Sequence, residues 1–116
     1  MVKMKKTLPT WKGSSTFSYV GSVREGVNIF VKGLTEGFPI RRNDLQEMLT
    51  KFSGQEVVVG ATRVGPWPKG SLGRWHHDKN KSYGWAGYIA AILIAEGFAV
   101  DGPGRWNVSF KVYPSP

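Results

Sequence analysis

The chain of 116 residues contains no cysteine and no long apolar run, and each absence excludes a class of structure. Without thiols, neither disulfide bonds nor thiolate metal sites can form. The longest nearly uncharged apolar run, residues 83–95, has about 13 residues, whereas a membrane-spanning helix needs about 20. The first residues are basic and lack the apolar stretch of a secretion signal. The sequence therefore predicts a cytoplasmic protein that does not enter a membrane.

Acidic residues are also scarce. The chain has eight Asp and Glu residues and sixteen Lys and Arg residues, so its formal net charge is +8. The cationic excess is divided equally between the two halves of the chain, and it is therefore not a property of one tail. A positive charge of this size can have no role beyond keeping the molecules apart in solution. A small and strongly basic protein, however, commonly binds a polyanion. We expect an anionic partner, with nucleic acid as the first candidate.

The sequence contains no recognisable catalytic or nucleotide-binding motif. Residues 65–71 superficially resemble a phosphate-binding P-loop, but the lysine between the last glycine and the serine is missing, and two prolines remove backbone donors. The eight carboxylates show no pairing pattern. Glu96 and Asp101, which flank the last helix and the last hairpin, are the two that could act as catalytic groups. We predict that the protein is not an enzyme and holds no cofactor.

One cluster has residue types that bind metals, namely His76, His77 and Asp78. Adjacent histidines on a helix point about 100° apart, so they do not grip one ion together. We therefore expect no metal site here, with His76 half-buried and His77 facing solvent.

The apolar pattern predicts a small single α+β domain over residues 16–116, preceded by a basic flexible arm over residues 1–15. Residues 16–20 and 27–31 are rich in aromatic and β-branched side chains, which favour strands. Residues 24–26 between them indicate a hairpin turn. A second hairpin is expected near the C-terminus, over residues 98–113.

Between the two predicted hairpins, the apolar residues recur at helical spacing. A helix is predicted over residues 44–53, with Asn43 and Gln46 as a capping box and Gly54 as its C-terminal stop. The apolar face of this helix consists of Leu45, Met48, Leu49 and Phe52. The short apolar run 56–60 that follows predicts a middle strand buried on both faces.

Two more helices are predicted, one over residues 72–79 with Ser71 as its N-cap and one over residues 83–96 that ends at Gly97. The last helix carries a strip of small residues, Gly84, Gly87, Ala91 and Ala95. Glycine costs about 1 kcal/mol in a helix interior, so the strip implies close packing. The partner is either another element of this chain or, less expectedly, a second copy.

The segment of residues 63–85 combines positive charge with aromatic side chains and has one acid, Asp78. Cations supply phosphate contacts, and flat rings supply stacking surfaces for bases. Trp67 lies between two prolines in a loop that should be stiff and exposed, whereas Trp75 and Trp85 are expected in the core. The predicted nucleic-acid contacts are Arg63, Trp67, Lys69, Arg74, His77, Lys79, Lys81 and Arg105.

From residue 43 onward, the order of elements is similar to that of winged-helix domains, in which the third helix enters the major groove and the hairpin forms the wing. The resemblance implies that residues 83–96 are the recognition helix. Lys79, Lys81 and Ser82 would form the turn before it, and Arg105 would be the wing tip. The predicted helix, however, has no Lys, Arg, Asn or Gln, the residues that make bidentate contacts with base edges.

The leading prediction is therefore a protein that binds nucleic acid, DNA first, through the phosphate backbone and with little sequence preference. Two alternatives belong to other classes. The first is a protein-interaction module or homodimer, based on the small-residue strip and Trp67. The second is a small-molecule-binding domain with a pocket that contains Trp85, Tyr88 and a carboxylate.

Overall fold

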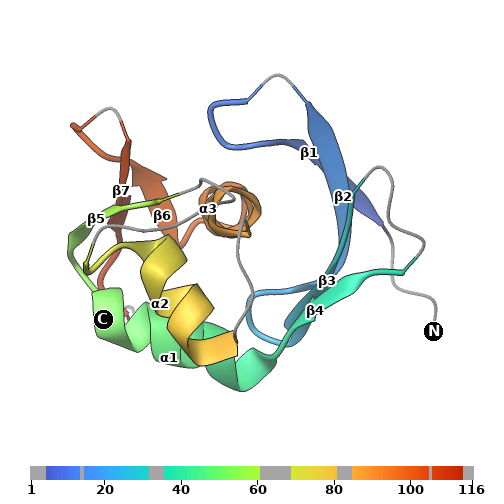
Figure 1. Cartoon of the computed structure of the whole chain (residues 1–116), viewed down its shortest axis with the longest axis horizontal. Coiled ribbons are helices and arrows are strands. Elements are labelled where there is room, and N and C mark those ends of the chain that lie inside the picture. The colour runs from blue at the N-terminus through green and yellow to red at the C-terminus, as the bar shows by residue number, and fades with distance from the viewer. Residues whose placement is uncertain are drawn as a thin grey trace.

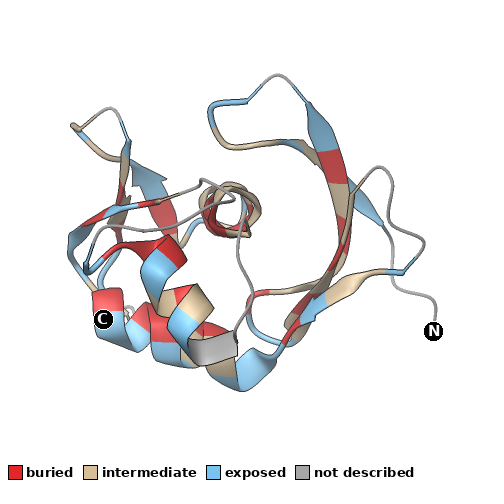
Figure 2. Cartoon of the chain, viewed as in Figure 1, coloured by how far each residue is buried: buried red, intermediate tan, exposed pale blue. Residues whose placement is uncertain are grey.

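The computed structural model describes residues 5–13, 15–31, 36–60, 69–80, 85–104 and 106–113. In this part of the chain, three helices and seven strands form two antiparallel sheets, with helix α3 between them (Figure 1). The predicted α+β class is confirmed. Buried residues gather where the helices meet the sheets, and they form one continuous core (Figure 2). No helix in the described part of the chain has both the length and the apolar character needed to cross a membrane.

The N-terminal sheet has the strand order β1-β2-β3-β4. Its strands are β1 (Lys6–Pro9), β2 (Thr16–Ser22), β3 (Gly26–Phe30) and β4 (Phe38–Ile40). In β2 and β3 the buried side chains alternate with partly exposed ones, and Tyr19 pairs with Ile29 across the strands. The turn between them is closed by the Glu25 N–H, which donates to the Ser22 carbonyl at 3.1 Å. The predicted first hairpin is confirmed.

Part of the predicted basic arm, residues 1–15, forms a strand. Lys6–Pro9 pairs antiparallel with β2 as an edge strand. Just beyond it, the Trp11 indole Nε1 donates to Asp101 Oδ1 at 3.1 Å. The segment lacks the long apolar alternation that predicts a strand, and its contacts are with residues distant in the sequence.

Helix α1 (Arg42–Phe52) buries the four apolar residues that predicted it. The expected capping box is wrong, because the N-cap residue is Arg41 and no side chain caps the helix there. The C-terminal stop is confirmed. Gly54 has a φ of +70°, a left-handed conformation that glycine adopts without the steric cost of a Cβ.

The second sheet has the order β5-β7-β6, formed by β5 (Glu56–Val58), β6 (Ala99–Asp101) and β7 (Asn107–Phe110). The prediction that β5 is buried on both faces is wrong. Val57 is buried, but Val58 on the opposite face is exposed. The reason is that only one face of this sheet packs on the core, as is common for antiparallel sheets.

Helices α2 (Leu72–Asn80) and α3 (Ala86–Ala95) confirm two further predicted elements, although α3 begins three residues later than expected. The small residues Ala91 and Ala95 of α3 line a groove with Leu8 and Trp11 from the β1 region. This end of the strip therefore faces the N-terminal edge strand and its following turn across the groove. Ser82 and Gly84 lie outside the described residues.

The carboxylate of Glu96, just after α3, joins this helix to the N-terminal sheet. The Tyr19 hydroxyl donates to Oε2 at 2.7 Å, and the Val23 backbone N–H donates to Oε1 at 2.9 Å. Burial, reinforced by the bond to the Glu96 carboxylate, raises the pKa of the Tyr19 hydroxyl above its usual range. Tyr19 therefore remains a neutral donor, and Glu96 has a structural role.

Replacing Glu96 with glutamine tests this role. The amide keeps the size of the side chain but turns one acceptor into a donor that faces another donor. Hydrogen bonds to charged groups contribute roughly 1.5–3 kcal/mol, so we expect a loss of about 2 kcal/mol in the free energy of unfolding, measured by urea denaturation. Tyr19→Phe, which removes only one of the two bonds, should cost less. Wild-type stability of Glu96→Gln would contradict the role.

Candidate functional site

The start of α2 is fixed by a side-chain cap and by a strand contact. The Arg74 N–H donates to Ser71 Oγ at 3.1 Å, which confirms the predicted N-cap. The Gly73 N–H donates to the Val59 carbonyl at 2.8 Å, beside β5. Ser71 and Leu72 are both fully buried. The first turn of α2 is thus anchored to the core, and the charged side chains around it project from a rigid base.

A basic cleft of about 420 Å³ lies between the C-terminal end of α1 and the start of α2. We call it the α1–α2 cleft. Its cationic residues are Lys51, Lys69 and Arg74, and all three are exposed. Trp75 contributes a half-buried ring that meets Phe52 edge-on, with the ring centroids 6.3 Å apart. The cleft therefore offers positive charge over an aromatic surface.

Asp78 is the single acid that lines the α1–α2 cleft, and it is engaged by α2 itself. Arg74 Nε donates to Asp78 Oδ2 at 3.1 Å and to Oδ1 at 3.3 Å, and His77 Nδ1 lies 3.4 Å from Oδ1. Desolvation raises the pKa of the Asp78 carboxyl, but the bonds from Arg74 and His77 outweigh it and hold that pKa below its ordinary value. The Arg74 charge is thus partly compensated.

Lys51 and Lys69 differ from Arg74, because within the described residues no carboxylate forms an ion pair with either lysine. Lys51 Nζ lies 5.8 Å from the centre of the Phe52 ring. Lysine at such a position acts as a point charge that can follow a phosphate oxygen. These two lysines are the strongest electrostatic feature of the α1–α2 cleft.

The structure brings together only part of the predicted contact set. Lys69 and Arg74 line the α1–α2 cleft, and His77 is adjacent to it through Asp78. Arg63, Trp67, Lys81 and Arg105 lie outside the described residues, and the side chain of Lys79 is likewise not described.

Lys51 is the cleft residue that the sequence did not indicate as a contact. It lies in the last turn of α1, where a basic side chain commonly only complements the helix dipole. No local pattern shows that this turn faces the start of α2. A tertiary contact, the packing of Phe52 against Trp75, places Lys51 there.

The two adjacent histidines have different environments. His76 is buried with 2% of its surface exposed, whereas His77 is half-exposed. The described residues contain no group of three or more His, Asp or Glu side chains that could hold a metal ion. Burial lowers the pKa of His76 to about 4, although the Asp44 carboxylate opposes the shift and His77 adds to it. His76 is therefore a neutral core residue, next to the Phe38 ring at 6.0 Å.

The His76 environment predicts a loss of stability in acid. The unfolded chain protonates this imidazole near pH 6.5 and the folded chain near pH 4, so the unfolded state binds more protons between these values. The contribution of His76 to the free energy of unfolding should be fully present above about pH 6.5. The free energy of unfolding should then decrease toward pH 4, by on the order of 3 kcal/mol. Urea denaturation at several pH values measures the effect. His77→Gln should keep the pH dependence, and His76→Leu should flatten it; an unchanged slope in His76→Leu would contradict the assignment.

Comparisons of the chain with protein-family models, with curated proteins and with solved structures find no match.

Proposed function

We propose that the protein binds nucleic acid, DNA first, mainly through phosphate contacts from the α1–α2 cleft. The observation that carries the proposal is the placement of Lys51 and Lys69, without carboxylate partners in the described part of the chain, beside Arg74 and the Trp75 ring. A phosphate backbone meets the three cations, and an unstacked base can lie against the aromatic surface.

We also propose a winged-helix-like arrangement for the C-terminal part of the chain. It is supported by the element order α1-β5-α2-α3-β6-β7 and by the strand order β5-β7-β6. Helix α3 carries no cationic or amide side chain over Ala86–Ala95, and half of its residues are buried. Base edges therefore lack a bidentate partner on this helix, which favours backbone binding with low sequence preference. The cytoplasmic location remains a prediction of the sequence.

A homodimer or protein-interaction module is the second candidate. It is favoured by exposed apolar side chains on or beside the three-stranded sheet, where Val58, Val100 and Trp106 are 37%, 47% and 55% exposed. A sedimentation coefficient that increases with protein concentration would support it. The aromatic pocket expected around Trp85 and Tyr88 is less favoured, because Trp85 stacks on Phe38 at 4.0 Å and Tyr88 meets Phe17 at 5.1 Å.

Fluorescence anisotropy with 3′-labelled, 5′-hydroxyl oligonucleotides tests the leading proposal. Duplex and single-stranded forms are titrated at several salt concentrations. Each phosphate contact contributes a slope of about −0.9 in log K against log salt on duplex DNA. We expect Lys69→Gln to weaken the slope by about 1 unit, and Lys51→Gln plus Lys69→Gln by about 2.

Arg41→Gln is the charge-matched control, because Arg41 is exposed and does not line the α1–α2 cleft. It removes one positive charge and should leave the slope close to that of the wild type. If Lys69→Gln and Arg41→Gln gave equal slopes of log K against log salt, the phosphate contacts would lie outside the α1–α2 cleft. An affinity that does not change with salt concentration, or no binding at low salt, would refute the proposed function.

A further inference from the structure

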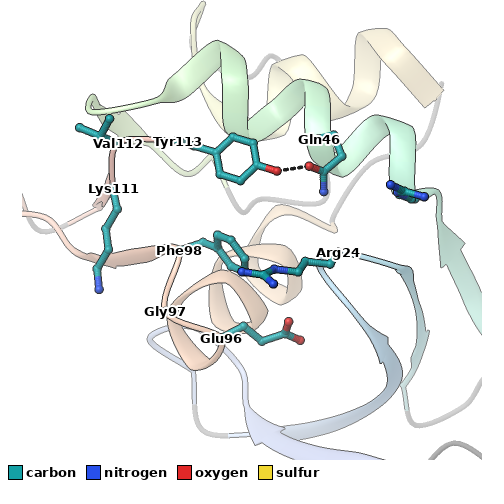
Figure 3. Close-up of a pocket in the computed structure, with 9 residues that line it drawn as sticks. Arg24, Gln46, Glu96, Gly97, Phe98, Lys111, Val112 and Tyr113 are labelled. Carbon is teal, nitrogen blue, oxygen red and sulfur yellow. Dashed lines mark hydrogen bonds between the residues drawn. The ribbon is translucent and has the colours of Figure 1, made fainter. Parts of the chain in front are cut away.

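A second basic cleft lies beside α1, between the β2–β3 turn and the residues after β7 (Figure 3). We call it the turn cleft. Its volume is about 530 Å³, within the range of roughly 300–1,000 Å³ typical of small-molecule sites. It shares no lining residue with the α1–α2 cleft. The two clefts are therefore distinct surfaces.

Three cations from different parts of the sequence line the turn cleft. Arg24 comes from the β2–β3 turn, Arg42 from the first turn of α1 and Lys111 from the residue after β7. Figure 3 shows the Arg24 side chain extending into the cleft. Among the residues that the structure describes, none of the three forms an ion pair with a carboxylate. Their charges are available to a ligand.

The acid in the turn cleft does not neutralise these cations by direct pairing. Both oxygens of Glu96 accept hydrogen bonds, from Tyr19 and from the Val23 N–H. Gln46 is fixed as well, since its Nε2 donates to the Val23 carbonyl at 3.3 Å and its Oε1 accepts from the Tyr113 hydroxyl. The wall of the cleft is thus held in place, and three cations against one carboxylate leave a net charge of +2.

We propose that the turn cleft binds the phosphomonoester group of a nucleotide-sized ligand. A phosphomonoester carries about −1.5 to −2 charges at pH 7, which matches the net charge of the cleft, whereas a carboxylate or a phosphodiester carries only one. Arginine pairs with phosphate in a bidentate geometry, and two arginines are present. Phe98 and Tyr113, half-buried with ring centroids 6.2 Å apart, supply an apolar wall for the rest of the ligand.

The phosphomonoester has two sources, a free mononucleotide or the 5′-phosphorylated end of a nucleic-acid strand. Isothermal titration calorimetry with 5′-AMP, and with adenosine as the control ligand, tests the first source. Anisotropy with one labelled oligonucleotide, bearing either a 5′-phosphate or a 5′-hydroxyl group, tests the second. In at least one arm, we expect the phosphorylated ligand to bind roughly tenfold more tightly or better than its control.

Variants locate the effect. Arg42→Gln and, independently, Lys111→Gln should each weaken binding of the phosphorylated ligand roughly tenfold, with circular dichroism confirming that they fold. Arg41 lies outside the turn cleft, so Arg41→Gln should retain the wild-type affinity. If Lys69→Gln alone loses binding to the 5′-hydroxyl oligonucleotide, that result concerns the α1–α2 cleft. It does not contradict phosphomonoester binding by the turn cleft. Equal binding with and without the phosphate in both arms, or equal effects of Arg42→Gln and Arg41→Gln, would overturn it.

Discussion

The partly buried carboxylate of Glu96 is the contact on which the relative placement of the two sheets depends. It follows α3, the helix between the sheets, and it accepts hydrogen bonds from a β2 side chain and from the backbone after β2. Apolar packing is non-directional, so a core alone leaves the angle between two sheets weakly specified. The two bonds to Glu96, with Gln46 bound to the Val23 carbonyl, set the position of the β2–β3 turn over α1. Arg24 lines one cleft with Arg42 and Lys111 because this turn is held there.

Helix α1 separates two basic surfaces of different character. At its C-terminal end, exposed lysines beside an aromatic floor form an open cleft that suits an extended polyanion. Elsewhere beside the helix, three cations that form no ion pair with any described residue line a second cleft, together with a carboxylate whose oxygens are already bonded, and this arrangement suits a compact dianion. The helix is anchored by four buried apolar side chains, so the spacing of the two surfaces is rigid. A strand bound along one surface with its phosphorylated end in the other would use both.

The sequence predicted the elements that depend on local signals. Period two predicted the β2–β3 hairpin, helical spacing predicted α1, and Ser71 predicted the start of α2. The sequence did not show features that depend on distant contacts: β1 pairs with β2 and lies beside the Trp11–Asp101 bond, and β5 packs on one face only. The cleft residues were hidden for the same reason. Arg24, Arg42 and Lys111 are far apart in the sequence, and no local pattern shows that two sheets and a helix bring them together.

The most direct test of nucleic-acid binding by the α1–α2 cleft is a titration of the isotope-labelled protein with a 5′-hydroxyl oligonucleotide, followed by backbone amide chemical shifts. The account predicts that the largest shift changes involve Lys51, Phe52 and residues 69–75, and that they diminish as salt is added. Shift changes confined to β5, β6 and Trp106, on the sheet with exposed apolar side chains, would contradict it and would favour a protein-binding surface there instead.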